Sequence, residues 1–404
     1  MKKLVSKFLL LSIFVFTSKS LGLFKDLFLV DYYSFTHVLD EYYYSFNIVS
    51  IFNGSLFSVI TLSVTPILIS LNDDISSSKL NGQLNAIVLC MTGFFFLIFN
   101  IVVFVSDSIN PFWHTLSPII ILSPLTSLIA VRFISSETHI NSLMEGIPPL
   151  VVVLSTCFLK ISLYASTALG FFLYFIISYL PVRKNYHFNF QFNKKLFAEV
   201  KQASFAIIVI MLLTDAIKIF DIHILSFIDE GSVVKFTLSE KISGIFISIG
   251  SLVLGRTLLP HFAKSNSSKK AFFGIAKWSA VTFLIVLCLI FILQKLNLEK
   301  LLLKLGQETL IPLLPLVRVS LLKIPIYISS LILSYWLLAK GKTKIVFLAT
   351  CIFFLLKVVP TLALYFNGML DVEYVIILSV FGYFTLYVSL LLTSAYEYKK
   401  NYSA

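Results

Sequence analysis

Ionisable side chains interrupt several long apolar stretches of this sequence. A charged group in the middle of a hydrocarbon layer costs roughly 2.5–3.5 kcal/mol on insertion scales, so it normally faces a polar interior. The groups that fit the membrane surface least well are Lys19, Asp215, Lys218, Lys241 and Arg318. Cations outnumber anions among them, and ammonium groups bind phosphate as point charges. The pattern therefore predicts an anionic ligand, with a diphosphate as the natural candidate.

A second set of ionisable residues lies near the ends of the same stretches: Lys25, Asp26, Asp221 and Lys235. The simplest interpretation is that these side chains snorkel to the membrane surface; the alternative is that they face an interior. Asp215, Lys218 and Asp221 follow one another at a spacing of three, which makes them neighbours on a helix. We predict that ion pairs at a gate involve Asp26, Asp40, Asp215, Lys218 and Glu240.

The elements that must position these residues are membrane-spanning helices. Hydrophobic residues make up 58% of the 404 residues and charged residues only 13%, against about 25% charged residues in soluble domains. The apolar residues come in blocks of about 20, the length that spans hydrocarbon as a helix. We predict an all-α polytopic fold with about twelve spans, at 4–30, 43–71, 82–106, 114–134, 144–162, 163–181, 202–222, 232–260, 272–294, 309–338, 343–366 and 373–395.

The distribution of Lys and Arg between the loops orients the spans. Loops around 31–42, 107–113, 223–231 and 367–372 have no Lys or Arg, whereas most basic residues fall in the loops of the opposite side. The positive-inside rule then places both termini in the cytoplasm. The chain is expected in a bacterial inner membrane, and its net charge of +12 reflects these loops rather than nucleic-acid binding. The first apolar run is expected to be a span and not a cleaved signal.

The chain is expected to divide into two lobes of six helices, 1–181 and 202–404, joined by a basic, aromatic cytoplasmic linker at 182–201. Residues 47–66 and 241–260 match at five positions when shifted by 194, which indicates an internal repeat. Each copy falls on the second span of its lobe. Parallel repeats of this kind are a transporter architecture, with the substrate path between the halves.

Signatures of other functions are weak. The four cysteines are far apart, and no metal motif of the His-Glu-x-x-His type occurs. A polysaccharide polymerase or ligase usually needs a large outer loop with Arg and His, but the outer loops here are short, and His37, His114 and His223 are isolated. A drug or cation antiporter should have an acidic cavity, for which Asp215 and Glu240 are the strong candidates. Both functions remain open alternatives, and the sequence indicates no cofactor.

Three segments resemble the lipid II flippase (MurJ/MviN) family. Residues 18–26, SKSLGLFKD, are similar to its first-span signature Ser-Arg-x-Leu-Gly-Phe-x-Arg-Asp. Asp40, followed by Tyr42, Tyr43, Ser45 and Phe46, resembles the family's entry to span two. Residues 239–242 and 255–260 resemble two motifs of its span eight.

The resemblance implies the fold of the multidrug/oligosaccharidyl-lipid/polysaccharide (MOP) exporters, with two lobes around a central cavity and alternating access. It implies an undecaprenyl-diphosphate sugar as the substrate, and it places the family's cavity arginines at Lys19, Lys25 and Lys241. A further family arginine falls at Asn47, so that cation is missing here. The sequence leaves open whether the cargo is lipid II or an O-antigen or capsule unit. It also leaves open any partner glycosyltransferase or polymerase, and coupling to membrane potential, Na⁺ or H⁺.

Overall fold

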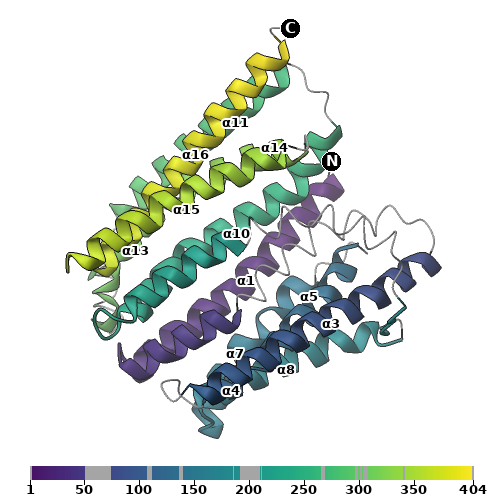
Figure 1. Cartoon of the computed structure of the whole chain (residues 1–404), viewed down its shortest axis with the longest axis vertical. Coiled ribbons are helices and arrows are strands. Elements are labelled where there is room, and N and C mark those ends of the chain that lie inside the picture. The colour runs from purple at the N-terminus through teal and green to yellow at the C-terminus, as the bar shows by residue number, and fades with distance from the viewer. Residues whose placement is uncertain are drawn as a thin grey trace. The chain divides into compact units, whose positions relative to one another are not determined.

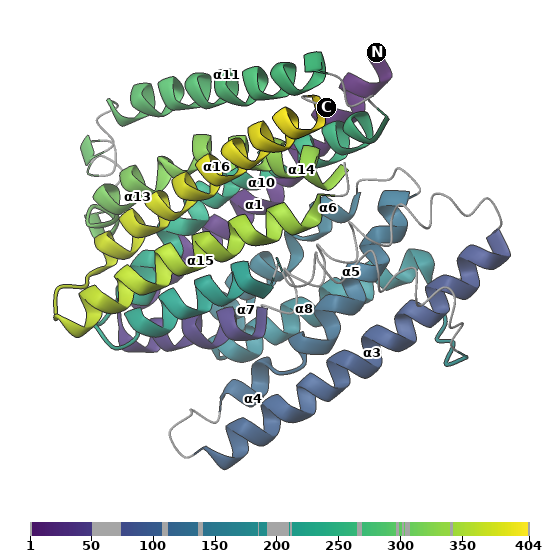
Figure 2. The same cartoon turned by 45° about the horizontal axis from the view of Figure 1, so that its top comes forward.

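Helices are the only regular secondary structure in the part of the chain that the computed structural model describes. This part comprises residues 2–50, 74–106, 112–135, 140–184, 186–191, 210, 212–264, 269–295, 299–300, 303, 308–339 and 342–402. The helices fall into two compact units, which Figures 1 and 2 show from two directions. Unit 1 contains Met1–Leu29 and Glu41–Asp215, and unit 2 contains Val30–Asp40 and Ala216–Ala404.

Unit 1 takes most of the first half of the chain. Its first helix, α1, spans Lys2–Tyr33, so its last turn belongs to unit 2, and a second helix covers 37–50 of the described residues. The remaining helices are α3 (Asp74–Val105), α4 (Trp113–Leu116), α5 (Ile119–Ser135), α6 (Ile140–Met144), α7 (Ile147–Leu159), α8 (Leu163–Tyr179) and the short η1 (Leu180–Val182). Helix α8 packs against both α5 and α7.

After Val30–Asp40, unit 2 resumes at Ala216, within a helix whose described part covers 212–225. It continues with α10 (Ser232–Lys264), α11 (Lys269–Gln294), η2 (Glu308–Leu310), α13 (Leu313–Leu321), α14 (Lys323–Ala339), α15 (Thr343–Phe366) and α16 (Val372–Tyr402). Helix α14 packs against α10, α11 and α16, and α15 packs along α16. Figure 1 shows α15 and α16 side by side in lime and yellow.

Seven stretches in the described part are long and apolar enough to cross a membrane: Asn81–Val105, Trp113–Ala130, Ile140–Leu159, Leu163–Val182, Leu313–Leu338, Thr343–Phe366 and Val372–Thr393. Each coincides with a predicted span to within a few residues. Helices α1 and α10 cover two more predicted spans, and each carries three ionisable residues close together: Lys19, Lys25 and Asp26 in α1, and Lys235, Glu240 and Lys241 in α10. The prediction of an all-α, multi-pass membrane protein is confirmed.

The burial of the spans separates those that face lipid from those inside a unit. Only 17% of the window in Asn81–Val105 is buried, and Phe104 and Val105 of α3 are 83% and 72% exposed. By contrast, 72% of the window in Trp113–Ala130 is buried. Exposed apolar side chains on this scale are stable only against acyl chains or another apolar surface. We therefore assign the outer face of α3 to lipid.

Two sequence predictions fall largely outside the described residues. One is the internal repeat, because 51–66 of its first copy are not described. The other is the linker at 182–201, of which the structure describes 182–184 and 186–191. Residues 186–191 have no regular secondary structure and lie against α3: the backbone N–H of Asn189 donates to Gly82 O (3.0 Å), and Asn85 Nδ2 donates to His187 O (2.8 Å). The start of the predicted linker is thus fastened to unit 1.

Candidate functional site

Lys19 forms an ion pair within unit 1. Its Nζ lies 3.1 Å from Oε2 of Glu145, in the turn between α6 and α7. Gly146 and the prolines Pro148 and Pro149 follow this turn, and proline at the first positions of a helix is compatible with α7 starting here. The pair is only half-buried, with 39% of the Lys19 side chain and 31% of the Glu145 side chain exposed. The Lys19 ammonium within helix α1 and the Glu145 carboxylate in the turn beside it are therefore both open to their surroundings.

Lys25 and Asp26 form a buried cluster with aromatic residues of the second helix. Lys25 Nζ lies 3.0 Å from Asp26 Oδ1, and Asp26 is fully buried. The Tyr43 hydroxyl donates to the same Asp26 oxygen at 2.7 Å. The rings of Tyr42, Tyr43 and Phe46 lie 5.4–5.7 Å from the Lys25 ammonium, within the range of cation–π attraction. The lysine charge is thus balanced by an adjacent carboxylate.

Asn47, where the resemblance puts a missing cation, is also buried in unit 1. Its Nδ2 donates to the Tyr43 carbonyl oxygen at 2.7 Å, one helical turn earlier. The amide therefore satisfies its own helix backbone. That Asn47 and Lys25 contact a substrate stays a prediction.

The other residues predicted for the site or its gate lie at the end of unit 1 or in unit 2. Lys241 of α10 and Asp215 are half-buried, whereas Arg318 of α13 and Lys218 are exposed. Asp215 is the last residue of unit 1, and Lys218 belongs to unit 2. The expectation that cations from both halves share one chamber stays a prediction.

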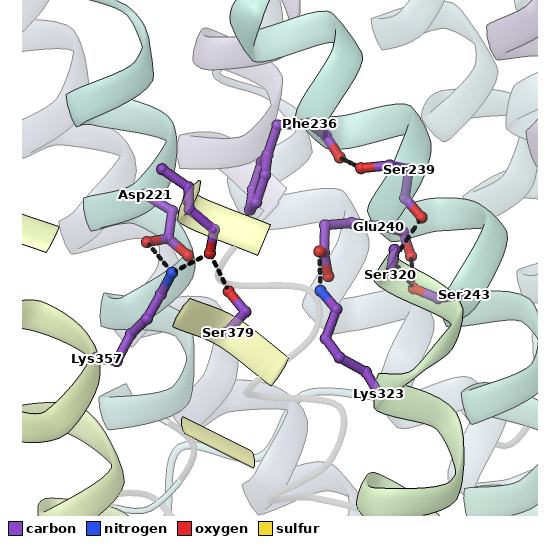
Figure 3. Close-up of polar contacts among 10 residues, drawn as sticks. Asp221, Phe236, Ser239, Glu240, Ser243, Ser320, Lys323, Lys357 and Ser379 are labelled. Atoms are coloured by element: carbon purple, nitrogen blue, oxygen red, sulfur yellow. Dashed lines mark hydrogen bonds and ion pairs between the residues drawn. The ribbon is translucent and has the colours of Figure 1, made fainter. Parts of the chain in front are cut away.

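Glu240 of α10 pairs with Lys323 at the start of α14. The Lys323 side chain is 1% exposed and that of Glu240 is 28% exposed. Three serines hydrogen-bond to one another beside the pair: the Ser320 hydroxyl lies within hydrogen-bond distance of Ser239 O (3.0 Å) and Ser243 Oγ (2.8 Å). Figure 3 shows Lys323 reaching toward Glu240 beside this serine group. The prediction that Glu240 takes part in an ion pair agrees with this contact, and its role as a gate stays a prediction.

A second ion pair in unit 2 was not predicted from the sequence. Lys357 of α15 lies 3.1 Å from Asp221 Oδ1 and donates to the carbonyl oxygen of Val375 on α16 at 2.6 Å. Lys357 and Asp221 are 0% and 2% exposed. Figure 3 shows the Lys357 ammonium pointing toward the Asp221 carboxylate. The available signal was the cost of an uncompensated lysine inside an apolar span, which requires an acid on another helix without saying which.

The snorkelling interpretation is wrong for Lys25, Asp26 and Asp221. Their exposures of 5%, 0% and 2% place them inside their units. Each has an oppositely charged partner that compensates the loss of hydration. Lys235 is half-buried, and its ammonium lies 5.6 Å from the centre of the Phe35 ring.

Asp40 holds the first turn of α10 within unit 2. Its Oδ2 accepts the N–H of Gly231 at 2.5 Å, and its Oδ1 accepts the N–H of Val234 at 2.8 Å. The first N–H groups of a helix lack partners in the helix itself, so these bonds act as a cap. Burial raises the pKa of Asp40 above its usual 3.8, although the two backbone hydrogen bonds oppose the shift.

The raised pKa of Asp40 predicts a pH effect on stability. Between 3.8 and the raised value, the folded protein holds a proton that the unfolded chain releases. The free energy of unfolding of the wild type, relative to Asp40→Asn, should therefore fall as the pH rises through this window. Unfolding in detergent at a series of acidic pH values measures it. A difference that grows with pH would contradict the assignment.

No family model matches the sequence, and no curated protein matches it. Solved structures do match. A structure of the lipid II flippase MurJ in an inward closed conformation has a TM-score of 0.72 at 18% identity, covering 95% of this chain and 87% of that one. The chain has the fold of the MOP-superfamily transporters.

Other MOP-type structures cover even more of the chain. A eukaryotic MATE transporter has a TM-score of 0.64 at 11% identity and covers 99% of this chain and 98% of its own. A MOP-superfamily transporter from Pyrococcus furiosus has a TM-score of 0.61 at 11% identity, with 97% and 95% covered. At these identities the matches establish the fold alone. The predicted MurJ- and MATE-like fold is confirmed.

Proposed function

We propose that this protein is a flippase that moves a lipid-linked oligosaccharide diphosphate across the bacterial inner membrane. Two lines of support converge on this proposal. The fold matches MurJ, a lipid II flippase, over 95% of the chain. The segments that resemble the MurJ family include 18–26, which contains Lys19, Lys25 and Asp26. Both termini would lie in the cytoplasm, and the cargo would be peptidoglycan precursor or a polysaccharide repeat unit.

The half-exposed pair of Lys19 and Glu145 carries the proposal. Charges in the middle of a span are costly in lipid, so their exposed surface should face a hydrated path. Glu145 compensates the charge of Lys19 at 3.1 Å. A diphosphate carries more negative charge than one carboxylate and can replace Glu145 as the partner of Lys19. The exchange lowers the cost of bringing an anionic head group into a low dielectric.

The lysines also bear on which diphosphate lipid is carried. Arginine binds phosphate with two parallel hydrogen bonds, whereas lysine supplies a single point charge. A site built on Lys19 therefore fixes the charge of the head group more strongly than its orientation. We infer a carrier that tolerates variation in the attached sugars, as a transporter of repeat units requires.

The substitution Lys19→Ala should reduce flipping by about 10- to 100-fold, because a hydrogen bond to a charged group contributes about 1.5–3 kcal/mol. Lys19→Arg keeps the charge and should retain most of the activity. The measurement is the fraction of a fluorescent undecaprenyl-diphosphate sugar in proteoliposomes that a membrane-impermeant quencher can reach. Lys184→Ala, which alters an exposed lysine beyond η1, is the matched control.

A drug or cation antiporter is the second candidate, because MATE transporters match 98–99% of the chain. Normal flipping by Lys19→Ala at normal expression would remove Lys19 from the site. Absence of flipping by the wild type, together with efflux of cationic dyes, would replace the flippase by the antiporter.

A further inference from the structure

Lys19 lies in a membrane whose own phospholipids carry phosphate groups. The head group of a phospholipid is smaller than a diphosphate oligosaccharide, so an opening that admits the proposed cargo also admits phospholipids. The Lys19 side chain is 39% exposed, and an ammonium group binds any phosphate as a point charge. Lysine by itself therefore does not distinguish the cargo from an abundant anionic phospholipid. Selection of the cargo requires a second feature of the site.

The Glu145 carboxylate is held beside Lys19 by the backbone of the turn between α6 and α7. The N–H of Glu145 donates to the carbonyl oxygen of Asn141 at 3.1 Å. The next residue, Gly146, lies against α1: a methyl group added there would be 3.5 Å from the Cα of Ser18, which directly precedes Lys19. The turn therefore presents its carboxylate to α1 at the position of the lysine.

Helix α8 fixes the same turn from another direction. A methyl group at Gly170 of α8 would lie 2.9 Å from the Cα of Pro148, at the start of α7. One helical turn further along α8, the hydroxyl of Tyr174 donates to Oδ1 of Asn141 in α6 at 3.3 Å. The charge of Glu145 acts electrostatically on this hydroxyl. Contacts with both α1 and α8 thus define where the carboxylate lies.

The ion pair between Lys19 and Glu145 is suited to reversible opening. Its side chains are 39% and 31% exposed, and an ion pair with this much exposure contributes little net stability. The pair of Lys25 and Asp26 differs, because it is buried and its opening would leave charges in apolar surroundings. An arriving anion can therefore displace Glu145 from Lys19 without disrupting the packing of unit 1.

We propose that Glu145 is a specificity-determining residue, an intramolecular anion that occupies Lys19 and keeps singly charged phospholipid head groups away from it. The proposal rests on the flippase function proposed for this protein. Because Glu145 is attached to the protein, its effective concentration at Lys19 is high whatever the lipid composition. Phosphatidylglycerol would exchange one negative charge for another. A diphosphate linked to lipid and sugar brings a second charge, and it displaces the carboxylate.

The substitution Glu145→Gln tests the proposal, because it preserves the shape of the side chain and removes its charge. In phosphatidylcholine proteoliposomes at low cargo concentration, the variant should flip a fluorescent undecaprenyl-diphosphate sugar about fivefold faster than the wild type. This factor corresponds to the loss of one half-exposed ion pair. Added phosphatidylglycerol should slow the variant progressively and leave the wild type nearly unchanged. A purely structural role of Glu145 would instead slow flipping in both membranes.

Three further variants assign the response to the ion pair. Glu145→Asp keeps the charge on a shorter side chain and should respond to phosphatidylglycerol less than Glu145→Gln does. The double variant Lys19→Ala/Glu145→Gln lacks the cation, so its residual flipping should not respond. Glu373→Gln is the matched control, because it removes a carboxylate from an exposed position of unit 2 and should behave as the wild type.

The flippase function and the role of Glu145 fail in different ways. If the wild type flips no diphosphate lipid in either membrane, the flippase function is overturned, and the selection of its cargo with it. If the wild type is active and phosphatidylglycerol slows Glu145→Gln no more than the wild type, only the role of Glu145 is overturned. The same conclusion follows if Glu145→Gln is slower than the wild type in phosphatidylcholine alone.

Discussion

Replacement of Lys357 by methionine is expected to lower the free energy of unfolding by about 3–5 kcal/mol, because it leaves Asp221 as a charge without its partner in a buried site. Methionine has a similar length and fills the same space between α15 and α16, so lost packing contributes little. Unfolding of the purified protein in mixed micelles of mild detergent and dodecyl sulfate provides the measurement.

The double variant Asp221→Asn/Lys357→Met separates the effect of leaving Asp221 unpaired from the effect of removing the whole ion pair. It has no unpaired charge and should recover most of the stability lost in the single variant. Lys184→Met, at an exposed position, should not change stability. If Lys357→Met is as stable as the wild type, Asp221 is neutral in the folded protein and the ion pair described above is not present at the pH of the experiment.

Gly170→Ala is expected to destabilise unit 1 by about 1–3 kcal/mol, the usual range for overpacking. A methyl group at Gly170 of α8 would lie 2.9 Å from both the Cα and the carbonyl oxygen of Pro148 in α7. These are backbone atoms near the start of a helix that has two prolines, so they cannot rotate out of the way. Helices α7 and α8 would have to separate. The same unfolding assay measures the effect.

Gly93→Ala in α3 is the matched control, because nothing lies within 4 Å of the added methyl group. There, removing glycine from a helix should leave stability unchanged or raise it by up to about 1 kcal/mol. Equal effects of the two substitutions would show that the close approach of α8 to Pro148 does not exist.

The spans were predictable because lipid imposes both their length and their composition. The predicted span 343–366 has the same first and last residues as α15. The predicted span 309–338 is one apolar stretch in which the structure places η2, α13 and α14. Pro325 explains part of this difference, because it has no N–H to donate to the preceding turn. Hydropathy measures apolar length and does not register such breaks.

The ion pairs were not predictable because their partners are far apart in sequence. Lys19 and Glu145 are separated by 126 residues, and Glu240 and Lys323 by 83. Helical periodicity relates only residues within a turn or two. Adjacent residues such as Lys25 and Asp26 do not face each other on a helix, yet they pair here because aromatic residues of the second helix enclose both. Sequence identified most of these charged residues as functional candidates but could not assign their partners.

The assignment of Val30–Asp40 to unit 2 has a practical consequence for dividing the protein. A split between Asp215 and Ala216 would give a C-terminal fragment without Asp40, and the first N–H groups of α10 would lose their acceptor. The fragment should fold only when a peptide covering 30–40 is added to it or fused to its N-terminus. If the peptide restores folding of the fragment, its addition or removal would control the folding of unit 2.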